Sequence, residues 1–537
     1  MSAQRALAIV LIVVAAAPLL VSATTNSRQE GILTLKLLAL NDLHGHLETT
    51  ARVGNRPVGG AAVLASYLRQ RKAANPDRTF LVHAGDIVGA SPPISALLHD
   101  EPSIEVLNVL GFAAGAVGNH EFDQGVEELL RLQNGGCHPA GCALPSGFGG
   151  AAFKYLAANV VDTASGQTLF PAYTVLAVDG VRFGLIGLVL QETPTIVVPT
   201  RVAGLRFEDE VEAGNRAVAE LKRQGVRTIV VLIHQGGERV APGSPSDRVE
   251  GPIVRIAAGL DDEVDLVVSG HTHRGYRALI GNKLLTQAFS FGTAFADIDL
   301  DIDRASGDVV DKRAEIVTTF ADVITPDPTV AQMVSGYAAA VAPVVSRVLG
   351  AAAAPIRREQ NAAGESPLGN LIADAQRAKS DNARIAFMNP GGIRDDLPAG
   401  QLTYGQLFTV QPFGNSLVSL DLTGEQLLRL LEQQWQLADR ARLLQVSRGF
   451  RYVWDARRPI GDRVVSAFLD DRPLDPAATY RVAVNSFLAA GGDGFTVLTE
   501  GSNPVGGPLD LDALVEYVQE QPQPLRSVVE GRITRLD

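Results

Sequence analysis

The chain has 537 residues, of which 46% are hydrophobic and 20% are charged. This composition excludes a chain that is disordered throughout, and the length exceeds what one ordinary hydrophobic core accommodates. The net charge of -12 repels phosphate backbones and disfavours a general nucleic-acid-binding protein. Small anionic substrates stay compatible with this charge if metal ions supply the positive charge.

Residues 1–23 have the pattern of an export signal. Arg5 precedes an apolar run from Ala6 to Leu20, and Val21-Ser22-Ala23 supplies the small residues of a cleavage site. We expect cleavage before Thr24 and an exported protein that is periplasmic, cell-surface or secreted. An uncleaved membrane anchor is the alternative, because the run is close to the shortest length that spans a bilayer.

The only two cysteines, Cys137 and Cys142, stand in a stretch rich in glycine. In an exported chain they predict one small disulfide loop. A metal site is the competing interpretation, but two cysteines and the neighbouring His138 do not complete a tetrahedral site.

Between Leu33 and about Leu300, apolar strand-like runs alternate with segments that can be helical, which predicts a layered α/β domain. The runs end in polar clusters. Since ligands collect at the carboxyl ends of strands in such folds, we expect these clusters to converge. The runs are Leu33 to Leu40, Thr79 to Val82, Ala113 to Val117, Thr228 to Ile233 and Val264 to Val268, and they lead into residues 41–46, 83–86, 118–123, 234–237 and 269–273.

A long helix is predicted over residues 327–348. Asp327 can cap it, Pro328 can occupy its first position, and Val330, Tyr337 and other apolar residues recur at helical spacing. Pro343 is expected to bend or shorten this helix. We therefore expect a first domain over 30–325, a bridging segment over 326–350 and a second α/β domain over 351–537.

The polar clusters contain a mixed set of potential metal ligands. Of nine histidines, His44, His120, His234, His271 and His273 fall in the clusters, together with Asp42, Asp86, Asn119 and Asp123. Carboxylate and amide oxygens mixed with imidazole nitrogens suit Mn, Zn, Fe or related divalent ions. Two such ions about 3.5–4 Å apart can clamp a phosphoryl group during in-line displacement.

The order of these motifs resembles the calcineurin-like metallophosphoesterase family, whose domain is a four-layer α/β sandwich. The resemblance rests on Asp42-x-His44-Gly45, Gly85-Asp86, Gly118-Asn119-His120-Glu121, His234 and Gly270-His271-Thr272-His273. It implies that Asp42, His44, Asp86 and His273 bind one divalent metal ion. Asp86, Asn119, His234 and His271 would bind a second, with Asp86 as the bridge. Position 273 varies in the family, so His273 is the least constrained of these assignments.

His120 and Asp123 resemble the His-Asp dyad of the same family. His120 would stabilise the transition state or protonate the leaving oxygen, and Asp123 would orient the imidazole. A helix cap is the alternative for Asp123, although it leaves His120 unexplained. His46 and His83 either hydrogen-bond to metal ligands or are ordinary packing residues, and His99 and His138 are expected on the surface.

The second half of the chain resembles the C-terminal domain of the 5'-nucleotidase and UDP-sugar hydrolase family. Its motifs here are residues 389–394, 411–414 and 487–495. The resemblance implies that Phe413 and Phe487 hold a nucleobase between their rings, from loops rich in glycine and proline. The implied substrate-binding set is Asn389, Gly392, Arg394, Phe413, Phe487 and Asp493, with Arg394 as the phosphate ligand. Turn glycines beside core phenylalanines are the structural alternative.

One position departs from the family pattern. Gly364 stands where nucleotide-hydrolysing relatives often have another phosphate-binding arginine, and Arg357 or Arg358 could compensate.

The sequence as a whole predicts a 5'-nucleotidase with two divalent metal ions and a small nucleotide substrate. It does not predict binding to a nucleic-acid polymer, and it does not define an oligomeric state. The alternatives are a 2',3'-cyclic nucleotide phosphodiesterase with 3'-nucleotidase activity, a UDP-sugar hydrolase, or a non-catalytic nucleotide-binding surface protein. In the family the two domains close on each other, so the bridging helix is expected to act as a hinge.

Overall fold

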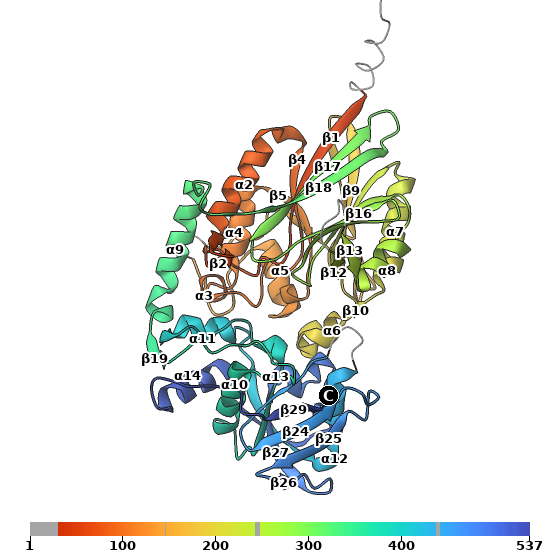
Figure 1. The fold of residues 1–537 in the computed structure, drawn as a ribbon. Helices are drawn as coiled ribbons and strands as arrows, with labels where there is room; N and C mark the ends of the chain where they lie inside the picture. The colour runs from red at the N-terminus through yellow and green to blue at the C-terminus, as the bar shows by residue number, and fades with distance from the viewer. Residues whose placement is uncertain (1–30, 145–146, 242–246, 437–440, 537) are drawn as a thin grey trace, which may run out of the picture.

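The structure is a computed structural model that describes residues 31–144, 147–241, 247–436 and 441–536. The predicted export signal, residues 1–23, lies outside the described residues. Figure 1 shows two bodies, one coloured red to green and one cyan to blue, with helix α9 (Pro328–Val345) running along one side from the first to the second.

Two six-stranded sheets form the centre of the first domain. The first contains, in spatial order, β18 (Val309–Thr318), β17 (Ala294–Asp303), β1 (Ile32–Leu40), β4 (Thr79–Ala84), β5 (Phe112–Ala116) and β6 (Lys154–Leu156). The second contains β15 (Gly275–Ile280), β16 (Lys283–Ala288), β14 (Val264–Ser269), β11 (Thr228–His234), β9 (Val181–Val189) and β8 (Tyr173–Val178). Short two-stranded sheets pair β2 (Ala51–Val53) with β3 (Arg56–Val58), β7 (Val160–Asp162) with β10 (Leu205–Phe207), and β12 (Glu238–Ala241) with β13 (Arg248–Glu250).

The two large sheets pack face to face through a shared apolar core. Leu37 of β1, Phe183 of β9 and Leu232 of β11 belong to this core and are fully buried. The outer face of the first sheet is covered by α2 (Ala61–Ala73), α4 (Glu101–Leu110) and α5 (Val126–Asn134), and that of the second by α7 (Glu210–Arg223) and α8 (Pro252–Gly259). The domain is thus a four-layer α/β sandwich, which confirms the predicted fold class.

The strands that precede the polar clusters are parallel within each sheet. β1 is parallel to β4 and β4 to β5, while β11 is parallel to both β9 and β14. Their carboxyl ends therefore lie at one edge of the sandwich, which places the polar clusters together.

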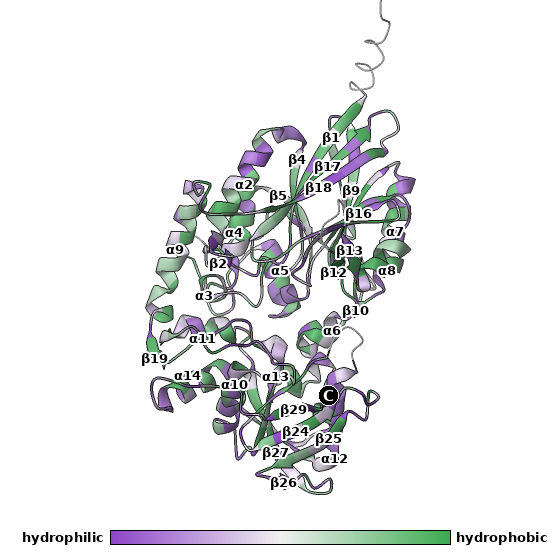
Figure 2. Cartoon of the chain, in the orientation of Figure 1, coloured by the Kyte–Doolittle hydropathy of each residue, from purple (hydrophilic) through white to green (hydrophobic). Residues whose placement is uncertain are grey.

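Helix α9 begins and ends close to the predicted limits. The Asp327 side chain accepts hydrogen bonds from the backbone N–H groups of Thr329 and Val330, and Pro343 lies in the last turns. By length and composition alone α9 could cross a membrane, and Figure 2 shows it mainly in white and green. Its Val330, Tyr337 and Val341 nevertheless pack into the core of the first domain. It is a bridging helix attached to that domain.

The second domain is also mixed α/β. One sheet has the order β23 (Gln445–Val446), β20 (Ile385–Met388), β27 (Thr479–Asn485), β22 (Ser416–Thr423) and β28 (Ser502–Leu509). The other has the order β26 (Arg472–Pro473), β25 (Val464–Leu469), β24 (Phe450–Asp455) and β29 (Ile533–Leu536), and β19 (Val348–Ala352) pairs with β21 (Gly400–Thr403). The helices are α10 (Pro367–Ala378), α11 (Tyr404–Val410), α12 (Gly424–Glu432), α13 (Ser486–Ala489) and α14 (Asp510–Glu520).

Short elements complete the region between the domains. Helices α3 (Pro93–Ala96) and α6 (Thr193–Ile196) belong to the first domain, and α3 packs against α11 while α6 packs against η6 (Gly492–Gly494). Cys137 and Cys142 are disulfide-bonded, which confirms the predicted local loop.

Candidate active site

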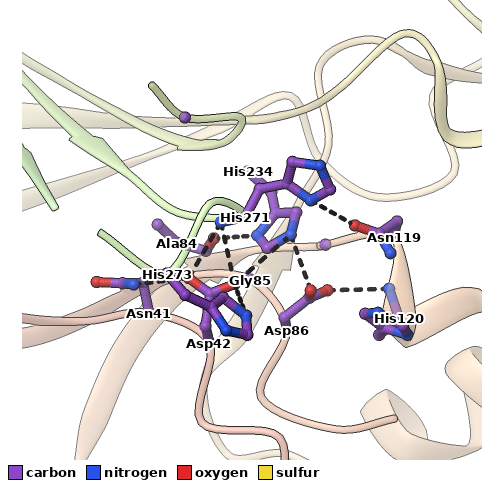
Figure 3. A network of polar contacts seen from close by, with 12 residues as sticks. Asn41, Asp42, Ala84, Gly85, Asp86, Asn119, His120, His234, His271 and His273 are labelled. Carbon is purple, nitrogen blue, oxygen red and sulfur yellow. Dashed lines mark hydrogen bonds and ion pairs between the residues drawn. The ribbon is translucent and has the colours of Figure 1, made fainter. Parts of the chain in front are cut away.

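The polar clusters meet at the edge of the sandwich, as Figure 3 shows. Asp42 and His44 follow β1, Asp86 follows β4, and Asn119 follows β5. His234 ends β11, and His271 and His273 follow β14. The structure therefore brings together every residue predicted to bind metal.

These side chains form two overlapping groups of donor atoms. In the first group, His273 Nε2 lies 3.4 Å from Asp42 Oδ1 and 3.2 Å from His44 Nε2. In the second group, His234 Nε2 lies 2.9 Å from Asp86 Oδ2, and His271 Nδ1 lies 3.0 Å from Asn119 Oδ1.

Asp86 lies between the groups. Its Oδ2 is 3.5 Å from His44 Nε2, in addition to its contact with His234. A carboxylate in this place can offer oxygen atoms to ions on both sides, as the bridging assignment requires.

The backbone at the ligands adopts an unusual conformation. Asp42, His44, Asp86, His271 and His273 all have positive φ, between 47° and 73°. Non-glycine residues avoid this region, and such strain persists only where surrounding contacts enforce it. Here the Asp42 N–H donates to the Gly85 carbonyl and the His44 N–H donates to the Asp86 carbonyl, so the loops after β1 and β4 hold each other.

The imidazoles are prepared for metal binding. Burial lowers the pKa of His44 and of His271 well below the ordinary value, which keeps both rings neutral. His234 Nδ1 contacts the Ala84 carbonyl at 2.8 Å, and its fully buried Nε2 lies 2.9 Å from Asp86 Oδ2. Burial alone would lower the pKa of His234, but the charge of Asp86 outweighs it and raises this pKa to about 9. A divalent ion between the ring nitrogen and the carboxylate would take the place of that proton.

Two buried residues that the sequence reasoning missed support the ligand loops. Glu121 accepts hydrogen bonds from the backbone N–H groups of Asp86, Ile87 and Gly118, at 2.9, 2.8 and 2.6 Å. Gln287 of β16 accepts at 3.0 Å from the N–H groups of His273 and Arg274 and donates at 3.2 Å to the Gly270 carbonyl. Glu121 lies inside a recognised motif, but nothing in the sequence distinguishes Gln287 from other polar strand residues.

His120 and Asp123 form a hydrogen-bonded pair at the rim of the site. His120 Nδ1 lies 2.8 Å from Asp123 Oδ2, and the His120 N–H donates to Asp86 Oδ1 at 2.9 Å. Burial lowers the pKa of His120, but the charges of Asp123 and Asp86 outweigh it and the pKa is raised overall. The alternative role of Asp123 as a helix cap has no support, because Gly125 occupies the position before α5 and no side chain caps it.

The four histidines outside the proposed metal site and the His120–Asp123 pair lie in different surroundings. His46 stacks on Phe291 with ring centroids 4.0 Å apart, and Phe291 also contacts the rings of His44 and His273. His83 packs among the rings of Phe112, Phe153 and Tyr155, so it is a packing residue. His99 and His138 are both partly exposed, and their rings stack on each other at 3.9 Å between ring centroids.

The second domain turns several predicted substrate-binding residues toward the first. The Phe413 ring lies parallel to that of His120 at 5.8 Å, and the Arg394 guanidinium lies 5.7 Å from the Phe413 ring centroid. Among the described residues Arg394 has no carboxylate partner, although the carboxylates of Asp123, Asp86 and Asp42 act on its charge. An enclosed, unpaired guanidinium facing the ligand carboxylates is suited to bind an anion.

Asp493 lies in a network of hydrogen-bonded side chains in the second domain. It accepts hydrogen bonds from Asn389 Nδ2 at 2.9 Å and from Arg442 Nη1 at 3.0 Å. Asn485 Nδ2 donates to Asn389 Oδ1 at 3.0 Å. The sequence reasoning missed Arg442 and Asn485.

Gly392 and Phe487 belong to the same region. Gly392 is buried against the side chains of Met388 and Asn389, and a Cβ atom there would lie 2.5 Å from Met388 Cε. The placement of Phe487 in a loop is wrong: it lies in helix α13, which begins because the Asn485 side chain accepts a hydrogen bond from the Leu488 N–H. Its ring covers Gly492.

Gly364 has a structural reason to be glycine. Its φ is 100°, and a Cβ atom there would lie 2.3 Å from Leu443 Cδ1. Of the two arginines expected to compensate, Arg357 pairs with Asp396 at 2.9 Å. Arg358 Nη1 instead donates at 3.1 Å to the carbonyl of Ile393, the residue before Arg394.

Comparison with known proteins identifies both domains. Residues 35–275 match the calcineurin-like phosphoesterase family and residues 344–500 match the 5'-nucleotidase C-terminal domain. A 5'-nucleotidase precursor from Thermus thermophilus has a solved structure that matches with a TM-score of 0.80 and 32% identity, over 94% of this chain and all of the other.

Curated relatives match this chain over both domains. The cell wall protein Lmo0130 of Listeria monocytogenes is 32% identical over 93% of this chain and 68% of its own length. Endonuclease YhcR of Bacillus subtilis is 38% identical over 93% of this chain, and the chain spans only 41% of that protein. By its two domains, its relatives and its fold, the chain belongs to the 5'-nucleotidase family of phosphoric monoester hydrolases.

Proposed function

We propose that this protein is an exported 5'-nucleotidase that uses two divalent metal ions to hydrolyse nucleoside phosphates to a nucleoside and inorganic phosphate. The observation that carries the proposal is the meeting of two ligand groups at Asp86, with the His120–Asp123 pair and the unpaired Arg394 facing the same place. One domain supplies the metal ligands and the other supplies an anion-binding group and aromatic rings.

In this proposal Asp42, His44, Asp86 and His273 hold one ion, and Asp86, Asn119, His234 and His271 hold the other. Bound metal ions would supply charge neutralisation and an activated water for phosphoester cleavage. His120, oriented by Asp123, stabilises the developing charge or gives a proton to the leaving oxygen. Glu121 and Gln287 keep the ligand loops in place through backbone hydrogen bonds.

The second domain binds the rest of the nucleotide. Arg394 receives the phosphate. Arg358, which donates a hydrogen bond to the Ile393 carbonyl next to Arg394, supplies a second positive charge in place of the arginine that Gly364 replaces. Phe413 and Phe487 stack on the base, while Asp493 and Asn389 receive the sugar or base. Stacking on such rings contributes about 1–3 kcal/mol per contact.

A panel of phosphoesters tests this function. Phosphate release is measured from AMP, 3'-AMP, 2',3'-cyclic AMP and UDP-glucose, each with added Mn, Zn or Ca. The proposal expects AMP to have the highest kcat/KM. A higher value for another substrate would replace it with the corresponding alternative, and adenosine binding without turnover of any phosphoester would make the protein a non-catalytic nucleotide-binding protein.

The second candidate is a 2',3'-cyclic nucleotide phosphodiesterase with 3'-nucleotidase activity. Gly364 favours it if Arg358 does not reach the phosphate, because a site with one arginine in place of two binds the dianion of a monoester less strongly. YfkN of Bacillus subtilis, 27% identical over 94% of this chain, is named a trifunctional nucleotide phosphoesterase.

Export is supported by the Arg5 to Ala23 pattern and by a relative named a cell wall protein. A small nucleotide is the proposed partner, and the net charge of -12 disfavours a nucleic-acid polymer.

A further inference from the structure

Gly89, in the loop after β4, contacts both the proposed metal centre and the His120–Asp123 pair. Its carbonyl oxygen lies 2.9 Å from His44 Nδ1. A carbonyl can only accept, so Nδ1 carries the proton of the neutral ring and Nε2 keeps the lone pair that binds a metal ion. Gly89 also packs on the pair, since a Cβ atom there would lie 2.3 Å from the His120 carbonyl oxygen and 2.8 Å from Asp123 Oδ2. The position of Gly89 therefore affects both groups.

The Asp100 carboxylate holds Gly89 in place. Its Oδ2 accepts a hydrogen bond from the Gly89 N–H at 3.3 Å, and its Oδ1 accepts one from the Ser95 hydroxyl at 2.7 Å. Ser95 is fully buried in α3, its Oγ lies 2.8 Å from that of Ser103, and its Cβ would be 2.6 Å from a Cβ atom at Gly45. Asp100 thus ties Gly89 to a side chain that packs against the loop after β1.

The role of an ordinary helix cap does not explain Asp100. The residue stands at the N-cap position of α4, where an aspartate side chain normally accepts hydrogen bonds from N–H groups of the first turn. Within the described structure no N–H group of α4 donates to this side chain, since the carboxylate is directed to Gly89 and Ser95 instead. Its φ of 56° is a conformation that persists only where surrounding contacts enforce it. Both features indicate a role outside α4.

Arg131 fixes the chain on both sides of Asp100. Its Nη2 donates to the His99 carbonyl at 3.3 Å, and its Nη1 donates to Glu101 Oε1 at 2.7 Å. Both charged side chains are largely buried, so this ion pair restrains the backbone more than an exposed pair would. The carboxylate that holds Gly89 therefore belongs to a segment that is itself fixed within the first domain.

We propose that Asp100 is a positioning residue that, through Gly89, sets His44 and the His120–Asp123 pair in their places relative to each other. This inference rests on the proposed function, because it takes His44 to be a metal ligand. The support reaches His44, which belongs to the ligand set of one ion only. Loss of the Asp100 carboxylate is therefore expected to weaken that ion more than the other.

Titration of the full-length protein with Mn tests the proposal. Asp100→Gly removes the carboxylate without strain, because glycine readily adopts a φ of 56°. Asp100→Asn keeps the contacts, since its amide oxygen can accept from the Gly89 N–H and its NH2 group can donate to the Ser95 hydroxyl. His99→Gly is the matched control, with the same replacement at the preceding residue, which has the same φ and leaves the carboxylate in place.

The wild type should bind two ions. In Asp100→Gly one of them should bind at least about tenfold more weakly, the loss typical of a residue that orients a metal ligand. At saturating Mn, kcat for the best substrate of the phosphoester panel should fall about tenfold while KM stays within about twofold, because His120 moves and the substrate-binding groups do not. Asp100→Asn and His99→Gly should keep metal affinity and kcat within about threefold of the wild type. A residue that only stabilised the fold would lower the melting temperature without this selective loss.

Wild-type affinity for both ions together with wild-type kcat in Asp100→Gly would overturn the proposal and leave the proposed function intact. Equal weakening of both ions, or the same loss in Asp100→Asn or in His99→Gly, would also overturn it. If Asp100→Gly does not fold, Ser95→Ala decides, because it removes the hydroxyl that holds Oδ1: one ion should bind about threefold more weakly, and unchanged affinity overturns the proposal. A wild type that binds no divalent ion would refute the proposed function, and this inference with it.

Discussion

At the residue scale, the candidate site owes its geometry to positions where the backbone departs from ordinary conformations. Asp42, His44, Asp86, His271 and His273 all lie in the left-handed region, each just after a strand. Sequence motifs predicted these residue types and their proximity. They could not predict the conformation, because it depends on hydrogen bonds between loops far apart in the chain.

The His120–Asp123 pair makes a prediction about rate. Asp123→Asn keeps the size of the side chain but removes the charge that orients and stabilises a protonated His120, so kcat for AMP should fall about 100-fold. Steady-state kinetics measure this change, and metal analysis of the same sample serves as the control. A variant with wild-type kcat and full metal content would show that the pair has no part in the reaction.

Arg358 and Arg357 offer a matched comparison. Arg358 lies beside Arg394, whereas Arg357 pairs with Asp396. Arg358→Gln should raise KM for AMP about tenfold, the loss expected for one charged hydrogen bond. Arg357→Gln should leave KM within about twofold, since an exposed ion pair contributes little. Equal effects of the two substitutions would remove Arg358 from the substrate site.

At the element scale, the sequence predicted the strands more reliably than the turns. The strands that precede the ligands end within two residues of the predicted limits, since each is a largely buried, mainly apolar run that polar or glycine-rich segments follow. The bridging helix was predicted from its Asp327 cap, Pro328 and its apolar spacing. Phe487 was misplaced because α13 is one short turn, whose only local marker is Asn485.

Gln287 shows how an element distant in sequence supports a ligand loop. It projects from β16 and fixes the turn between β14 and β15 that carries His271 and His273. Periodicity does not reveal this role, because the contacts depend on how β16 and β14 pair.

Replacement of Gln287 tests this support. Gln287→Leu leaves several buried backbone groups unsatisfied, at about 1–3 kcal/mol each, and should lower both metal content and melting temperature. Thr286→Val is the matched control in the same strand, because the buried Thr286 hydroxyl has no hydrogen-bond partner among the described residues. Wild-type metal content in Gln287→Leu would refute the supporting role.

At the scale of the whole molecule, the site needs both domains. The first supplies the metal ligands and the dyad, and the second brings Phe413 and Arg394 against them. Each domain could be recognised from its own motifs. The contacts between them could not, because the rings of His120 and Phe413 come together only when the domains face each other.

If turnover needs the domains to rotate, a covalent link between them should suppress it. A disulfide between cysteines introduced on α3 and α11, which pack together, should reduce AMP turnover at least about tenfold when formed, and reduction should restore it. Each single-cysteine variant and the wild type, treated alike, control for the native Cys137–Cys142 disulfide. Undiminished turnover in the linked protein would rule out the hinge.

The dinuclear metal centre is the central claim, and the metal content of wild type and Asp86→Ala tests it most directly. Elemental analysis after equilibration with Mn or Zn should find two ions per wild-type chain, as a two-metal site requires. Asp86→Ala should lose the bridging carboxylate and with it both ions' function, so AMP hydrolysis should fall by about 1000-fold or more. One ion in the fully active wild type, or two ions and full activity in Asp86→Ala, would contradict the account.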